Sequence, residues 1–291
     1  MLTVAIDGHS LGLDPLMDIA RRGARVVIAD SAKLRIEGSR QVVDAALSQG
    51  RAVYGVTTGF GKFSDTVIGR TQAETLQRNL ILSHATGVGD YLSKDVVRAA
   101  LALRINALCK GYSGIRLTTL ETLAEMLNRG VVPAIPEKGS LGASGDLAPL
   151  SHLCSVLIGS GEAWHNGTLL PGIKAMESAG LSPVTLQAKE GLALINGTQV
   201  MTAIGCLALH DAEVLAKTAD IASMLSFESL RGIPAAYSSR IVGVRSHPGA
   251  ARTAANLRRL VEGSSLATAP GDLRVQDAYS LRCIPQVHGA S

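Results

Sequence analysis

The sequence predicts a mainly α-helical fold in which a long-helix bundle follows a smaller mixed α/β region. Hydrophobic residues make up 46% of the 291 residues, alanine and leucine are abundant, and helical patterns dominate from residue 72 onward. Alanine and leucine are strong helix formers, and a chain of this length can bury a sizeable core. We therefore expect a mixed N-terminal domain over residues 1–185 and the start of the long-helix bundle over residues 186–291.

The first third of the chain is expected to mix strands with a helix. Apolar runs at residues 2–7, 25–28 and 52–56 have the length of short strands. Residues 39–49 follow a helical pattern that Gly50 ends at its C′ position. This alternation of short strands and helix is the reason for placing a mixed region at the start of the chain.

Helices separated by one glycine-rich and proline-rich loop are expected next. Ser93 can cap a helix that runs to about Cys109, because serine is a favoured N-cap residue. A second helix is expected over residues 116–129. The loop of residues 132–145 follows, and Asp146 can cap the helix after it.

Longer helices are expected in the second half, after a short β-hairpin. Residues 161–183 carry the turn signals of a small surface hairpin. A long helical run is expected over residues 186–230, and another helix over residues 248–261, with a proline in its first turn. No helix-stop signal precedes Ser291, so we expect the fold to continue beyond it.

Charge and cysteine content argue against several classes of function. The net charge of +4 comes from scattered basic residues, which form neither a nucleic-acid stripe nor a polybasic membrane patch. The four cysteines form no CxxC pair and the seven histidines no HExxH motif, so neither a disulfide framework nor a metal site is expected. The N-terminus lacks a signal-peptide pattern, and the apolar stretch at 192–209 contains polar residues. We expect a cytoplasmic protein that binds neither nucleic acid nor membrane.

The loop from Gly139 to Asp146 has the clearest chemical potential. It nearly spells the G-x-S-x-G nucleophile elbow, but Asp146 occupies the position of the last glycine. Its three glycines would suit a phosphate cradle, but no Lys-Ser/Thr pair follows them. Taken alone, the tripeptide Ala143-Ser144-Gly145 is more often a helix-capping turn.

The wider sequence favours a different interpretation of this loop. Residues 142–150, GASGDLAPL, resemble the signature of the ammonia-lyases that act on histidine, phenylalanine and tyrosine. Four further motifs of that family, in the expected order, are similar to residues 54–61, 79–89, 194–199 and 276–283. Five ordered motifs are far more specific than one. The chain is therefore similar to the aromatic amino acid ammonia-lyases, with the pattern of members that use histidine.

The resemblance implies a cofactor made from the chain itself. In that family the Ala-Ser-Gly backbone condenses to 4-methylidene-imidazol-5-one (MIO), an electrophilic prosthetic group. Gly145 has no side chain, so its amide nitrogen can approach the Ala143 carbonyl, and Ser144 loses its hydroxyl as water. The resemblance therefore implies that Ala143, Ser144 and Gly145 form MIO, with no metal required.

The resemblance also implies roles for residues in the other motifs. Tyr54 would be the catalytic base that removes a β-proton from the substrate. Asn196 would hold the prosthetic ring and the substrate, and Arg282 would bind the substrate carboxylate with its bidentate fork. Gln276 and Tyr279 would support the ring and the amine, and Tyr279 is counted among the catalytic residues.

His84 bears on the choice of substrate. It follows Ser83, as in family members that use histidine, and its ring can hydrogen-bond an imidazole or a phenol. The implied reaction is the non-oxidative elimination of ammonia from L-histidine to trans-urocanate, in histidine degradation. The alternatives are a tyrosine or phenylalanine ammonia-lyase, or an aminomutase with the same prosthetic group. An alternative from another class is a truncated, non-catalytic remnant that serves as a structural or interaction module.

The length of the chain leads to one more expectation. Members of the family are substantially longer than 291 residues, and their active sites are shared between the subunits of a homotetramer. The resemblance therefore implies a C-terminally truncated member with an incomplete bundle. We expect the 291-residue chain to have little or no activity by itself.

Overall fold

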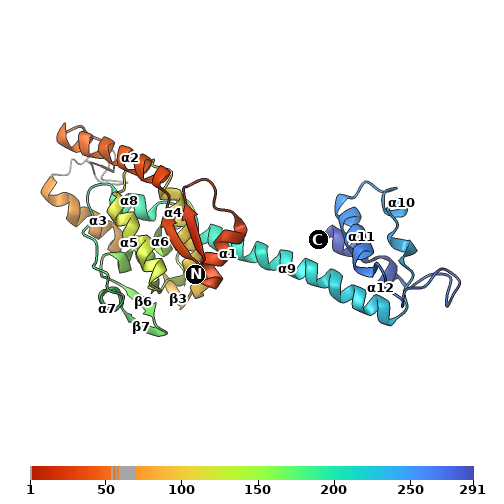
Figure 1. Ribbon diagram of the computed structural model, residues 1–291. Coiled ribbons are helices and arrows are strands. Elements are labelled where there is room, and N and C mark those ends of the chain that lie inside the picture. Colours follow the sequence, from red (N-terminus) through yellow and green to blue (C-terminus); the bar gives the residue numbers. More distant parts are fainter. Residues whose placement is uncertain (1, 54, 57, 59–69) are drawn as a thin grey trace. The chain divides into compact units, whose positions relative to one another are not determined.

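The computed structural model describes residues 2–53, 55–56, 58 and 70–291. Its contacts divide the chain into two compact units, Met1–Leu207 and Ala208–Ser291 (Figure 1). Helices dominate both units, and the predicted mainly α class is confirmed.

The first unit begins with two parallel strands joined by a helix. Strand β1 (Thr3–Ile6) pairs with β2 (Arg25–Ile28), and helix α1 (Leu13–Arg22) connects them. Both strands were expected, whereas α1 was not. The strand expected at residues 52–56 is wrong, since residues 52, 53, 55 and 56 belong to no strand. Helix α2 (Asp30–Ser48) begins earlier than the helix expected at 39–49 and ends one residue before it, with Gln49 as its C-cap.

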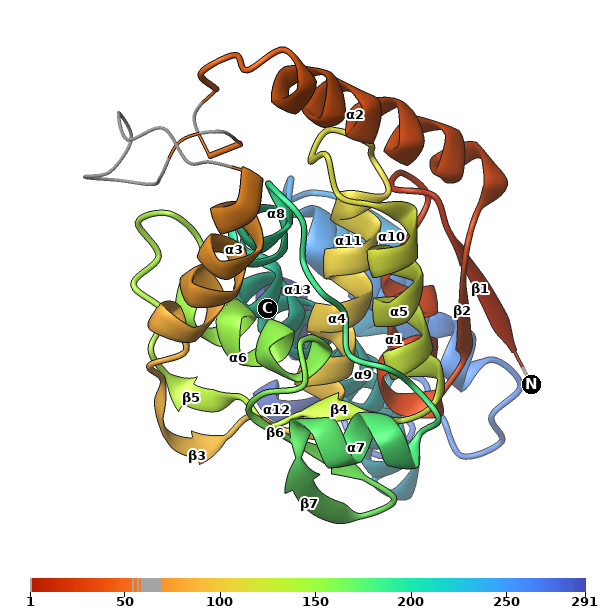
Figure 2. The same cartoon turned by 90° about the vertical axis from the view of Figure 1, so that its left-hand side faces the viewer.

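Four helices contribute much of the core of the first unit: α3 (Arg70–His84), α4 (Lys94–Leu108), α5 (Leu117–Asn128) and α6 (Leu147–Leu157). In the view of Figure 2, α4 lies in the middle, with α3 and α6 on one side and α1 and α5 on the other. Helices α4 and α5 confirm the helices expected at 93–109 and 116–129. Because α4 is buried on nearly all sides, its sequence is apolar around most of its circumference.

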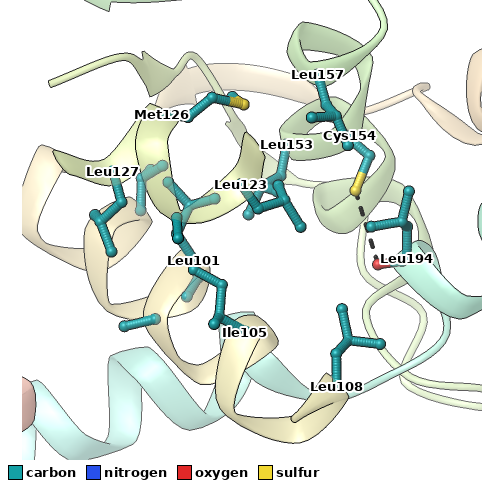
Figure 3. Packing of buried hydrophobic residues seen from close by; sticks show 14 of the residues in the cluster. Leu101, Ile105, Leu108, Leu123, Met126, Leu127, Leu153, Cys154, Leu157 and Leu194 are labelled. Atoms are coloured by element: carbon teal, nitrogen blue, oxygen red, sulfur yellow. Dashed lines mark hydrogen bonds between the residues drawn. The ribbon is translucent and has the colours of Figure 1, made fainter. Parts of the chain in front are cut away.

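Side chains from several helices interlock in this core (Figure 3). Leu101 and Ile105 of α4 lie in one cluster with Leu123 of α5 and Leu153 of α6, all without measurable exposure. The Cys154 thiol lies 3.8 Å from the Leu194 carbonyl oxygen, so the end of helix α8 (Glu190–Ile195) joins the same core. Dense packing of this kind fixes the helix ends from which the loops of the site emerge.

Short strands lie at one end of the first unit (Figure 2). One antiparallel pair contains β3 (Val88–Tyr91) and β5 (Pro136–Lys138). A three-stranded antiparallel sheet contains β4 (Val132–Pro133), β6 (Glu162–His165) and β7 (Thr168–Pro171). The β6–β7 pair confirms the expected hairpin, and the residues after it form helix α7 (Gly172–Ser178).

The turn of the β6–β7 hairpin explains its tight register. Asn166 and Gly167 both have positive φ, 49° and 83°. Positive φ at both central residues is the mark of a type I′ turn, whose twist matches that of the flanking strands. The Asn-Gly dipeptide alone therefore fixes this connection.

The long helical run expected at residues 186–230 is interrupted. Helix α8 (Glu190–Ile195) ends at Asn196, whose backbone is extended, and α9 (Gln199–Ser229) begins after a short turn. By length and composition, residues 190–229 contain one apolar segment that could span a membrane, but core helices of soluble proteins pass the same test. The domain boundary expected between residues 185 and 186 stays a prediction. The contacts divide the chain later because α8 packs on α3 and α6.

The second unit is built around the remainder of α9. It contains a 3₁₀ turn at Pro234–Tyr237 and the helices α10 (Ser239–Val242), α11 (Pro248–Val261), α12 (Tyr279–Arg282) and α13 (Ile284–Ala290). Helix α11 confirms the expected helix at 248–261. The small core of the second unit centres on the fully buried side chains of Phe227 and Tyr237, whose ring centroids are 5.5 Å apart.

Candidate active site

The Ala143-Ser144-Gly145 segment forms a turn in which the chain doubles back on itself. Isolated β-bridges join Gly142 to Gly145 and Ala143 to Gly145, so the backbone of Gly145 lies beside that of Ala143. Gly142 and Gly145 have φ of +79° and +90°, a region that glycine enters without steric cost. The turn thus has the close backbone approach that condensation of Gly145 onto Ala143 requires.

The downstream end of this turn packs on the turn between α8 and α9. A Cβ on Gly145 would lie 2.3 Å from the carbonyl oxygen of Gly197, so no side chain fits there. The Asp146 N–H donates to the same carbonyl at 2.6 Å. Two motifs that are distant in sequence, the Ala-Ser-Gly segment and the segment 194–199, are therefore in direct backbone contact.

The Asp146 side chain strengthens this contact. Its carboxylate is buried and accepts from Ser140 Oγ at 2.8 Å and from the Met201 N–H at 2.9 Å. Asp146 occupies the expected N-cap position of α6, but the expectation that it caps that helix is corrected, because its side chain makes no capping bond there. It satisfies an amide in the first turn of α9 instead, a long-range role without a local signal in the sequence.

Asn196 lies on the same turn. It is exposed at the C-terminal end of α8, where its N–H donates to the Leu192 carbonyl. Ala143 and Ser144 are exposed as well, and Gly145 is half-buried. The predicted ring-forming and ring-holding residues thus lie on two touching surface turns of the first unit.

Arg104 lies beneath the Asn196 turn and was missed by sequence reasoning. Its side chain is buried on α4, with Nη1 donating to Gln199 Oε1 at 2.7 Å and Nη2 donating to the Ala193 carbonyl. Burial lowers the pKa of this guanidinium to about 10. An arginine inside an apolar helical pattern is the only sequence feature that could have drawn attention to it.

His84 is half-buried at the C-terminal end of α3. Its Nδ1 lies 2.8 Å from the Leu80 carbonyl oxygen and 3.1 Å from Ser83 Oγ. Because a carbonyl oxygen only accepts, Nδ1 must carry the proton. In the neutral ring, Nε2 is then a hydrogen-bond acceptor.

The segment that carries His84 contacts the loop before the Ala-Ser-Gly turn and also bonds to His152. The Gly87 N–H donates to Nε2 of His152 on α6 at 2.9 Å. A Cβ on Gly139 would lie 3.0 Å from Gly87 Cα, so the two loops touch through their backbones. Burial lowers the pKa of His152 below its usual value, which favours the neutral ring that this bond needs.

The second unit holds the other three described candidates. Gln276 and Arg282 line a cavity of about 300 Å³ together with Asp277. The Arg282 guanidinium carbon lies 4.2 Å from the centroid of the Tyr279 ring, a cation–π distance, while Arg282 Nε is buried without a hydrogen-bond partner. Tyr279 is largely exposed.

Asp277 is a residue of this cavity that sequence reasoning did not single out. Its buried carboxylate accepts from the Ile233 N–H at 2.7 Å and from Arg274 Nε at 2.6 Å. It therefore fixes the backbone immediately before Tyr279 and Arg282.

Four of the five motifs lie wholly within the described parts of the chain. The first unit brings together the segments of His84, of the Ala-Ser-Gly turn and of Asn196, and the second unit brings together Gln276, Tyr279 and Arg282. Tyr54 lies outside the described residues. Within the described residues, no group of three histidine, cysteine or acidic side chains is arranged to hold a metal ion.

The helical fold and a turn suited to backbone condensation define a class of protein. Residues 11–291 match the family model of the aromatic amino acid lyases, and the chain belongs to this family. Over 291 residues it is 57% identical to a histidine ammonia-lyase of Alkaliphilus oremlandii, covering all of this chain and 57% of that protein. The chain therefore spans little more than half the length of this curated relative.

Solved structures agree with this assignment. A tyrosine aminomutase from Streptomyces globisporus matches with a TM-score of 0.92 and 38% identity, over 99% of this chain and 58% of that one. A histidine ammonia-lyase from Trypanosoma cruzi matches with a TM-score of 0.89 and 42% identity, over 99% of this chain and 53% of that one. The predicted family and its helical fold type are confirmed.

Proposed function

We propose that this chain is part of a histidine ammonia-lyase, which eliminates ammonia from L-histidine to give trans-urocanate. The observation that carries the proposal is the turn in which the Gly145 backbone lies beside that of Ala143. The Gly197 backbone packs directly against Gly145 in this turn. This geometry fits the formation of MIO from Ala143, Ser144 and Gly145. The 57% identity to a histidine ammonia-lyase supports the choice of substrate.

The residues around the turn fit the proposed group. When formed, MIO supplies an electrophile for the substrate amine. The Asp146 N–H and the Asn196 turn hold the downstream end of the condensing segment, and Asn196 is exposed next to it. Position and exposure support the role of Asn196 in holding the ring and the substrate.

His84 supports an imidazole substrate through its second nitrogen. With Nδ1 held by the Leu80 carbonyl, the neutral ring offers Nε2 as an acceptor for the N–H of a substrate imidazole. A phenol O–H could donate to the same atom, so a tyrosine ammonia-lyase or an aminomutase is the second candidate.

Arg282 is proposed to bind the substrate carboxylate. Its Nε is a buried donor without a partner on a residue that lines a cavity, and a carboxylate would satisfy it. Gln276 lines the same cavity, and Tyr279 stacks on the guanidinium, which supports their roles beside the ring and the amine. The role of Tyr54 as the base rests on its motif.

The remaining parts of the proposal follow from the family and the composition. The complete enzyme is proposed to be a cytoplasmic homotetramer that acts on a free amino acid. It would need no metal and would bind neither nucleic acid nor membrane. The non-catalytic alternative differs in one measurable respect, because a structural module has no need of a condensed turn.

Intact mass spectrometry tests the proposal directly. Condensation removes two water molecules, so the purified protein should weigh less than its sequence by that amount. Ser144→Ala should abolish the mass loss and the release of urocanate by the full-length enzyme. The matched control is Ser48→Ala, since Ser48 bonds only within its own helix turn. Full activity in Ser144→Ala would refute the assignment, and faster turnover of tyrosine than of histidine would favour the second candidate.

A further inference from the structure

Arg104 is a buried cation whose hydrogen-bond partners are all uncharged. It is 4% exposed, its guanidinium donates to an amide oxygen and a backbone carbonyl, and Nε is buried without a partner. A buried charge without a counter-ion is costly, and an apolar residue at this position would avoid that cost. The reason for an arginine must therefore lie in what its guanidinium contacts.

Both acceptors flank the turn that presents Asn196. Ala193 belongs to the last turn of α8, where carbonyls lack partners within the helix, and Gln199 is the first residue of α9. A Cβ on Gly197 would lie 2.2 Å from Arg104 Nη1. The guanidinium therefore ties the end of one helix to the start of the next, directly against Gly197.

The carbonyl of Gly197 faces the Ala-Ser-Gly turn. It accepts from the Asp146 N–H, and Gly145 packs on the same carbonyl. Gly197 is thus held between Arg104 and Gly145. A displacement of the guanidinium would therefore displace Gly197 and, with it, the segment that is proposed to condense.

We propose that Arg104 is a positioning residue that fixes the turn of residues 196–198 against Gly145. It thereby keeps the position of Asn196 relative to the condensing segment fixed during ring closure and substrate binding. This role rests on the proposed function. The fork of the guanidinium reaches acceptors on both sides of Gly197 at once. A lysine ammonium is a point charge and would hold only one of them well.

Arg98 provides a matched control on the same helix. It is half-buried and likewise donates only to uncharged acceptors, the carbonyls of Ile19, Ala20 and Leu127. These acceptors belong to α1 and α5 rather than to the candidate site. Arg98→Met therefore removes an arginine that also bonds to carbonyls between helices, without touching the Gly197 turn.

Hydrogen–deuterium exchange of the 291-residue chain tests the proposal. The Asp146 and Met201 amides, which donate across the two turns, should exchange at least about tenfold faster in Arg104→Met than in the parent, since a hydrogen bond to a charged group is lost. Arg98→Met, compared at equal global stability, should leave both amides protected. Arg104→Lys and Gln199→Ala should give intermediate rates, and they decide the matter if Arg104→Met does not fold.

Intact mass is the second readout. The condensed fraction should fall in Arg104→Met and stay at the parent level in Arg98→Met. Unchanged exchange at Asp146 and Met201 in the Arg104 variants would overturn the proposal. If the parent shows no loss of water, the proposed cofactor is wrong, and the exchange rates alone then decide the role of Arg104.

Discussion

Glu190 offers a stringent test of how the first unit is held together. Its carboxylate has no solvent exposure and accepts five hydrogen bonds. Three come from Arg116, through its N–H, Nε and Nη2 at 3.1, 3.0 and 2.6 Å. Thr119 Oγ1 and the Gln187 N–H donate the other two, each at 2.7 Å. One buried carboxylate thus joins α5 to the start of the helix that ends at Asn196.

Glu190→Gln keeps the shape of the side chain but removes its charge. An amide NH₂ would then face donors of Arg116, and the guanidinium would lose its counter-charge. Removing one partner of a buried ion pair costs about 3–5 kcal/mol of unfolding free energy. Arg116 keeps 25% side-chain exposure and a bond to the Thr185 carbonyl, so we expect the lower end, about 3 kcal/mol. For a unit of this size, that loss lowers Tm by roughly 6–12 °C.

Urea and thermal unfolding followed by circular dichroism measure this loss. The control is Glu177→Gln, because Glu177 forms an exposed pair with Lys174 and should contribute less than about 1 kcal/mol. Adding Arg116→Met to Glu190→Gln should cost far less than the sum of the two single changes, since the residues share one network. A Glu190→Gln protein as stable as Glu177→Gln would refute the reasoning.

Two further predictions concern pH and helix packing. The Gly87–His152 bond needs a neutral ring, so its contribution to stability is present above pH 6.5 and is lost as the pH falls through the lowered pKa of His152. His152→Gln, which accepts without titrating, should flatten the fall in urea midpoint below pH 6.5; an unchanged slope would contradict this. A Cβ on Gly249 would lie 1.9 Å from the Gly289 carbonyl oxygen, so Gly249→Ala should destabilise the second unit by about 2 kcal/mol or more in thermal unfolding. Gly205→Ala, with no atom within 4 Å, should be neutral or stabilising, and equal behaviour of the two variants would argue against the α11–α13 contact.

Several parts of the fold were predictable because their signals are local. The glycine after a helix, the Asn-Gly turn at residues 166–167 and the proline at the start of α11 each act within a few residues. Helix α1 was missed although it is strongly amphipathic, because its short pattern lies between two strands. Residues 52–56 have an apolar composition, but residues 52, 53, 55 and 56 belong to no strand, so composition alone misled the prediction there.

The interruption between α8 and α9 was missed although a local signal for it exists. Asn196-Gly197 is the same dipeptide that forms the turn at residues 166–167, but it lies in an apolar run whose pattern favours a continuous helix. The sequence could not show that Gly197 is confined between Arg104 and Gly145, which lie far from it along the chain. Close backbone contacts of this kind leave no periodic trace in the sequence.

The sequence by itself determined the family and the order of the motifs, and it singled out the segment that is proposed to condense. Ala143, Ser144 and Gly145 are informative alone because the proposed chemistry takes place within their own backbone. Only the tertiary structure decided which residues hold that segment, namely Asp146, Gly197 and Arg104. The physical reason is that a buried polar group must find its partner in space, and helix packing rather than sequence spacing places that partner.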